Sequence, residues 1–240
     1  MRSGNPALGD KTFQRPRVGT DAMSIDGTVN KTGLLLVMVI AAASFSWGQF
    51  LENGLNPFLH WGGIIGGFIV AMITIFKKEW APVTAPLYAV LEGLALGGIS
   101  ALMESIYPGI VFQAILGTFG TLFALLMAYK SGLIKATENF KLGVVAATGG
   151  IALIYILSLV LGLFGIQIPL IHESGPIGIG FSVFVCIIAA LNLVLDFDFI
   201  EDGAKRMAPK YMEWYAAFGL LVTLVWLYLE ILRLLAKSRK

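Results

Sequence analysis

The stretch GPIGIGFSVFVCIIAALNLVLDFDFI, residues 175–200, contains no charged residue before Asp196. A helix needs about 20 predominantly apolar residues to cross the hydrocarbon core of a bilayer, and this stretch supplies them. The whole chain has the same character, with 57% hydrophobic residues, 13% charged residues and a mean hydropathy of +0.82. This composition excludes a soluble cytosolic or secreted globular enzyme and indicates an integral membrane protein.

Six further apolar runs accompany this one, so we predict an all-α protein with seven transmembrane helices packed as a bundle. In chain order the runs cover residues 33–51, 58–76, 86–103, 110–129, 142–171, 175–200 and 214–235. We therefore expect a polar tail at 1–32, a transmembrane domain at 33–235 and a short basic tail at 236–240. The fifth run is longer than one crossing requires, and we expect Gly162, Gly165 and Pro169 to end its helix early.

The distribution of Lys and Arg predicts how the chain is oriented. The N-terminal tail and the second, fourth and sixth connections together carry thirteen of these residues, whereas the other three connections between spans carry none. Basic residues are retained on the cytoplasmic side, so we predict that the N-terminus is cytoplasmic. Seven crossings then place the C-terminus outside, although the chain ends with the basic residues Arg233, Lys237, Arg239 and Lys240. Either the early helices determine the topology or the last segment crosses incompletely.

Carboxyl groups inside the spans identify candidate functional residues, because each costs on the order of 2.5–3.5 kcal/mol to insert. Glu92 lies in the third span, Asp196 near the end of the sixth and Glu230 in the seventh. Asn192 precedes Asp196 by four residues, so the two share a helix face, which we take to face inward. Asp198 points about 200° away from Asp196 around the helix, and we expect it to be interfacial. We expect three carboxylates to be solvated helix ends: Glu201, Asp202 and Glu213.

Two interpretations of Glu230 are open. In the first it forms a local ion pair with Arg233, three residues later. In the second it faces Asp196 across the bundle, and the two carboxyl groups titrate as a coupled pair that senses pH. Glu92 has no basic residue within helical reach, so it is protonated, hydrogen-bonded to another helix, or part of an ion path together with Asn192 and Asp198.

The sequence around these carboxyl groups resembles the Bax inhibitor-1/YccA family. The resembling stretches are VLEGLALGG at 90–98, LDFDFIE at 195–201 and LYLEILRLL at 227–235. The opening MRSGNPAL and the block MEWYAAFGLLVTLVWLYLE at 212–230 resemble its bacterial, actinobacterial-type branch. The resemblance covers residues 33–235 and implies a seven-helix membrane fold. It places Asp196 and Glu230 at the positions of the family's acidic pair, and Glu92 at that of its third-helix glutamate.

Several members of this family are regarded as pH-sensitive calcium leak channels gated by that acidic pair, and others as modulators of cell death or of a membrane-bound protease. The resemblance therefore implies a calcium or cation leak in the plasma membrane of a bacterium, gated by Asp196 and Glu230, which would also be its calcium ligands. The alternative is a regulatory membrane protein without transport that acts on a protein partner. The acidic positions are 34 residues apart and the second is Glu instead of Asp, so Glu213 is an alternative partner of Asp196.

We expect no enzymatic activity and no cofactor. Neither acidic residue lies in the G-x-G-D pattern of intramembrane aspartic proteases, and a zinc hydrolase would need more ligands than His60 and His172, the two histidines of the chain, can provide. The net charge of +2, spread over several connections, gives no basic surface for nucleic acid. The expected partners are the lipid bilayer, a calcium ion and a membrane protein.

Overall fold

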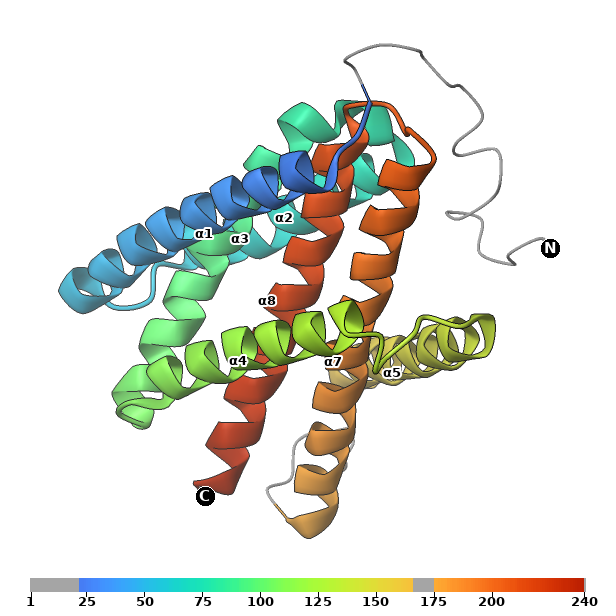
Figure 1. The fold of residues 1–240 in the computed structure, drawn as a ribbon. Helices are drawn as coiled ribbons and strands as arrows, with labels where there is room; N and C mark the ends of the chain where they lie inside the picture. Colours follow the sequence, from blue (N-terminus) through green and yellow to red (C-terminus); the bar gives the residue numbers. More distant parts are fainter. Residues whose placement is uncertain (1–21, 166–174, 240) are drawn as a thin grey trace. The chain divides into compact units, whose positions relative to one another are not determined.

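The computed structural model describes residues 22–165 and 175–239 (Figure 1). Within these residues, seven helices are long and apolar enough to cross a membrane. They are α1 Ile25–Asn53, α2 Pro57–Phe76, α3 Ala81–Ile106, α4 Ile110–Lys130, α5 Glu138–Leu163, α7 Pro176–Lys205 and α8 Met212–Ser238, and a short 3-10 helix, η2 Lys78–Trp80, precedes α3. Each predicted run falls mainly in one of these helices, which confirms the predicted fold class.

Helix α1 begins at Ile25, inside the stretch that we predicted as a polar tail. Ser24 caps the helix, because its side-chain oxygen accepts a hydrogen bond from the Gly27 N–H at 3.0 Å. The hydroxyls of Thr28 and Thr32 each donate to the carbonyl oxygen four residues earlier, at 2.9 Å. These local bonds satisfy the polar groups of the first turns, so residues 25–32 are helical. Helix α8 similarly continues through Ser238, beyond the predicted end at residue 235.

Helix α5 ends at Leu163, as the glycines after the fifth apolar run predicted. Gly165 follows with a φ of +76°, a left-handed conformation that glycine adopts without steric cost. The third residue expected to stop this helix, Pro169, lies outside the described residues.

The chain forms two compact units, which we describe separately. Unit 1 contains residues 1–99 and 198–221, and unit 2 contains residues 100–197 and 222–240. Helices α1 and α2 belong to unit 1, and α4 and α5 belong to unit 2. Helices α3, α7 and α8 contribute residues to both units.

In unit 1, glycines at the helix contacts allow the backbones of α1 and α2 to approach that of α3 closely. A Cβ atom on Gly93 would lie 2.5 Å from the Val39 carbonyl oxygen of α1, and one on Gly97 would lie 2.2 Å from the Ala43 oxygen. Gly63 on α2 approaches the backbone of α3 in the same way. Small residues at helix contacts allow such close backbone approach within a membrane, where packing replaces the hydrophobic effect as the main source of helix association.

In unit 2, helices α5 and α7 form a small apolar core from Ile151, Val185 and Ile188. Trp226 of α8 packs against this cluster, so three helices meet there. Helix α3 is joined to α8 by a hydrogen bond of 2.7 Å between the Ser100 and Tyr228 hydroxyls. These contacts hold the segments of α5, α7 and α8 that carry the candidate carboxyl groups of this unit.

The basic end of α8 is bonded to other elements of unit 2. Lys237 is buried and donates to the Gly178 carbonyl at 3.0 Å, near the start of α7. Arg239 donates to the Pro108 carbonyl at 3.0 Å, in the connection between α3 and α4. Helix α8 therefore reaches the connections expected on the outer side, which favours a complete seventh crossing. The cytoplasmic placement of the N-terminus stays a prediction.

Candidate functional site

Asp196 lies in unit 2, on the third quarter of α7, and one of its carboxyl oxygens has no partner. The Thr223 side chain of α8 hydrogen-bonds the Asp196 carboxyl group. The Oδ2 atom is buried and accepts no hydrogen bond within the part of the chain that the structure describes. An unpartnered buried carboxylate oxygen is costly, so this atom requires a proton or a cation when the membrane excludes water.

Asn192 lies one helical turn before Asp196 and faces α5. Its Nδ2 atom donates to the Thr148 hydroxyl at 2.8 Å and to the Ile188 carbonyl of its own helix, also at 2.8 Å. Thr223 is bonded to Asp196, Asn192 lies one turn away, and Thr148 is bonded to Asn192, so unit 2 brings neutral amide and hydroxyl groups, of the kind that hard cations bind, to this part of α7.

Glu230 belongs to a closed group of three side chains. Glu230 is buried, with 2% of its surface exposed. Its carboxylate accepts a hydrogen bond from the Tyr155 hydroxyl of α5 at 2.9 Å. Arg233 Nη1 lies 3.1 Å from Glu230 Oε1 and donates to the Tyr155 oxygen at 2.7 Å. The Arg233 guanidinium also stacks on the Tyr155 ring, 5.2 Å from its centroid. The local ion pair that the spacing predicted is therefore present, and Tyr155 completes it.

The structure does not join Asp196 to Glu230 as a hydrogen-bonded pair. Asp196 is level with Thr223, whereas Glu230 is two turns further along α8, about 10 Å by the rise of the helix. Within the described residues, the Glu230 carboxylate bonds to the Tyr155 hydroxyl and to the Arg233 guanidinium. The direct pair expected between the last two helices is thus replaced by two separate sites, because the second carboxyl group lies too deep in α8.

Glu92 lies in unit 1 and takes its hydrogen bond from its own helix. Tyr88, four residues earlier on α3, bonds the carboxyl group through its side chain. The Tyr88 ring packs edge-on against Phe218 of α8, with the centroids 5.0 Å apart. Gly67 of α2 passes so close that a Cβ atom there would lie 3.2 Å from Glu92 Oε2. Glu92 of α3 therefore lies against α2. Its hydrogen-bond partner is Tyr88 of its own helix, whereas we had considered a partner on another helix.

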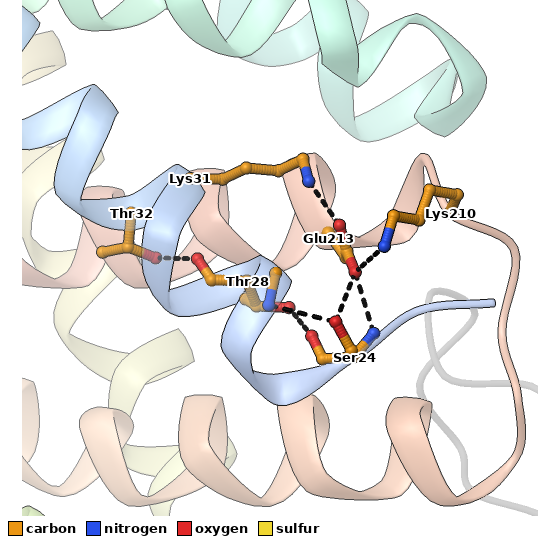
Figure 2. Close-up of polar contacts among 7 residues, drawn as sticks. Ser24, Thr28, Lys31, Thr32, Lys210 and Glu213 are labelled. Carbon is orange, nitrogen blue, oxygen red and sulfur yellow. Dashed lines mark hydrogen bonds and ion pairs between the residues drawn. The ribbon is translucent and has the colours of Figure 1, made fainter. Parts of the chain in front are cut away.

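Glu213, which we expected to be a solvated helix end, is fully buried in unit 1. Figure 2 shows its contacts with Ser24, Lys31 and Lys210. Its Oε1 atom accepts from the Ser24 backbone N–H at 2.8 Å, the Ser24 hydroxyl at 2.9 Å and the Lys210 ammonium at 2.8 Å. Its Oε2 atom pairs with the Lys31 ammonium. One carboxylate thus holds two lysines and the cap of α1.

Glu213 is buried by a chain segment that we predicted as part of the polar tail. The Met23 N–H donates to the Ala208 carbonyl at 2.7 Å and Ala22 forms a β-bridge with Pro209, so residues 22–23 lie on the connection between α7 and α8. Gly27 faces the carboxyl group, and a Cβ atom at this position would lie 2.1 Å from Glu213 Oε1. The bonds of Glu213 go to Ser24, Lys31 and Lys210. They give no support to the alternative in which Glu213 pairs with Asp196.

Asp198 and the neighbouring carboxylates Glu201 and Asp202 are partly buried near the end of α7, and the interfacial position of Asp198 stays a prediction. Lys205 forms an ion pair of 2.6 Å with Glu201 and is also within electrostatic range of Asp198. Arg206 pairs with Asp202 at 2.9 Å. Both pairs are partly exposed and join residues four apart at the end of α7, so each contributes little to stability.

The described carboxyl groups do not form a metal cage. Within residues 22–165 and 175–239, no group of three or more His, Cys, Asp or Glu side chains could hold a metal ion. Asp196 and Glu230 therefore belong to no such cluster of three ligands among the described residues.

The chain matches a known protein family over nearly its whole length. The model of the family described as Bax inhibitor 1 like matches residues 5–240, which is nearly the whole chain. No curated protein and no solved structure matches the chain significantly.

Proposed function

Because the chain belongs to the Bax inhibitor 1 like family, we propose that this multi-pass membrane protein is a pH-sensitive calcium or cation leak of a bacterial plasma membrane. In this proposal Asp196 is the titrating residue of the gate. Glu230 keeps the last part of α8 in place through Tyr155 and Arg233. Glu92 and Asn192 lie along the ion path.

The observation that carries this proposal is the unpartnered Oδ2 atom of Asp196. When the carboxyl group is protonated, it is neutral and can remain bonded to Thr223, which links α7 to α8. When the proton leaves, the charge attracts a cation, and the amide of Asn192 and the two threonine hydroxyls supply further polar contacts. Deprotonation increases as pH rises, so this mechanism requires cation influx to increase with pH.

Glu230, the other candidate carboxyl group of unit 2, already has a partner of opposite charge. Glu230 and Arg233 neutralise each other on α8, two turns from Thr223. From α4, the group beside this part of α7 is Tyr129, whose ring packs against Phe197 with the centroids 5.9 Å apart. Asp196 is therefore the residue whose charge the proposal varies, and a substitution there is the direct test.

We expect Asp196→Asn to remove the pH dependence of calcium influx while preserving the fold. Purified protein would be reconstituted in liposomes that contain a calcium-sensitive dye, and influx would be recorded between about pH 5 and pH 8. A single titrating carboxyl group changes its ionised fraction by at most about tenfold per pH unit, which sets the largest slope for the unmodified protein. In Asp196→Asn the ratio of influx at the two ends of this range should fall to about one.

Glu230→Gln is the matched control, because it removes a second buried carboxylate of unit 2 without changing Asp196. It should retain the pH response, even where the lost ion pair lowers thermal stability. An Asp196→Asn protein that still responds to pH would show that another group controls the gate. If folded protein at every pH gave no influx above empty liposomes, the alternative of a regulatory protein without transport would be favoured.

A further inference from the structure

A pocket in unit 1 lies where α2 ends and α3 begins, and it has no role in the proposed leak. Its volume is about 600 Å³, and it is lined by Phe76, Lys77, Lys78, Glu79, Trp80 and Tyr211. We call it the α2–α3 pocket. The charged run Lys77–Glu79 interrupts two apolar helices, so the pocket lies at the level where the hydrocarbon core gives way to lipid headgroups.

Two lysine ammonium groups give the pocket its positive charge. Lys77 Nζ lies 4.4 Å from the centre of the Trp80 ring, and Lys78 Nζ lies 5.2 Å from the centre of the Tyr215 ring. The Lys77 ammonium makes no hydrogen bond or ion pair to any residue that the structure describes, and its backbone N–H donates to the Ile73 carbonyl. A cation above an aromatic ring keeps N–H donors available for an anion, so Lys77 can bind a phosphate while it remains stacked.

Two large aromatic side chains beside the lysines are exposed to the surroundings. Phe76 is 81% exposed and Trp80 is 54% exposed. At a membrane boundary such side chains contact acyl chains and glycerol groups, and tryptophan is enriched at this level. A ligand that combines a phosphate with apolar chains therefore matches both halves of the pocket.

We propose that the α2–α3 pocket binds the headgroup phosphodiester of a glycerophospholipid, with its phosphate at Lys77 and Lys78 and its chains along Phe76 and Trp80. Glu79 also lines the pocket and opposes a second negative charge. A phosphodiester, which carries one negative charge, is therefore favoured over a phosphomonoester, which carries up to two.

Tyr211, from the connection between α7 and α8, also lines the pocket and supplies a neutral donor. Burial, with a smaller contribution from the Glu79 carboxylate, raises the pKa of the Tyr211 hydroxyl above its ordinary value. The hydroxyl consequently keeps its proton at physiological pH and can donate a hydrogen bond to a phosphate oxygen.

The test compares lipid binding by two double variants of the full chain. Delipidated protein in detergent would be titrated with phosphatidylglycerol, and bound lipid would be counted by native mass spectrometry. K77Q/K78Q should bind about 30-fold more weakly, since each lysine near a membrane surface contributes about 1 kcal/mol to binding of an anionic lipid. K130Q/K135Q removes two lysines from a different connection and should bind within about twofold of the unmodified protein.

Three further arms separate the sources of the phosphate. Phosphatidic acid, a phosphomonoester, should bind more weakly than phosphatidylglycerol, and Glu79→Gln should reduce that difference. Inorganic phosphate should compete poorly because it has no acyl chains. Equal losses in the two double variants would show general electrostatic attraction and would overturn the proposal. Full competition by inorganic phosphate would also overturn it, because the pocket would then be a site for the free anion.

Discussion

Replacing Glu213 with alanine is expected to destabilise the protein by roughly 3 kcal/mol, at the lower end of the range for breaking a buried ion pair. The carboxylate is fully buried and is the shared partner of Lys31, Lys210 and the cap of α1. Its loss leaves two ammonium groups close together without their counter-charge. The cost stays near the lower limit because the lysine side chains are 18% and 49% exposed and regain water.

The measurement combines unfolding in detergent with hydrogen exchange of residues 22–32. Exchange should accelerate over the first turns of α1, because Ser24 loses the carboxylate that holds it. Glu201→Ala is the matched control, since it removes a carboxylate that is 37% exposed and paired with Lys205 on the same helix. It should change stability by less than about 1 kcal/mol. Equal effects of the two substitutions would contradict a special role for Glu213.

The second large effect is expected for Gly97→Ala, which should destabilise the protein by about 1–3 kcal/mol through overpacking. The added methyl group would lie 2.2 Å from the Ala43 carbonyl oxygen and 2.8 Å from the Ala43 Cα atom. Both are backbone atoms, so α1 and α3 must move apart. The cost is a property of the backbone contact and not of a flexible side chain.

Gly150→Ala provides the control for Gly97→Ala. Gly150 lies on α5, and a Cβ atom there would have no heavy atom within 4 Å. The substitution should be neutral or stabilising by up to about 1 kcal/mol, because alanine has the higher helix propensity. Thermal unfolding of both variants in the same detergent would measure this difference in stability. A loss of stability in Gly150→Ala as large as in Gly97→Ala would rule out the close α1–α3 contact as its cause.

Local sequence predicted the features that depend on neighbouring residues along the chain. An uncharged run of sufficient length crosses the bilayer whatever its partners are, and the seven spans were found in this way. The ion pair between Glu230 and Arg233 was likewise predicted, because a separation of three residues places two side chains on one helix face. The early end of α5 followed from its glycines for the same reason. Assignment to the actinobacterial-type branch stays a prediction.

The tertiary structure alone decided how these carboxyl groups are partnered. Whether Asp196 meets Glu230 depends on the depth of each residue in its own helix, and a sequence separation across a turn does not give that depth. The burial of Glu213 depends on Ser24, which is 189 positions away in the sequence. Composition predicted a polar tail up to residue 32, because these polar residues show no apolar periodicity that would indicate a helix. Local bonds make residues 25–32 helical, but the contacts of Ser24 and Lys31 with Glu213 attach this segment to the start of α8, and such long-range pairing appears only when the chain has folded.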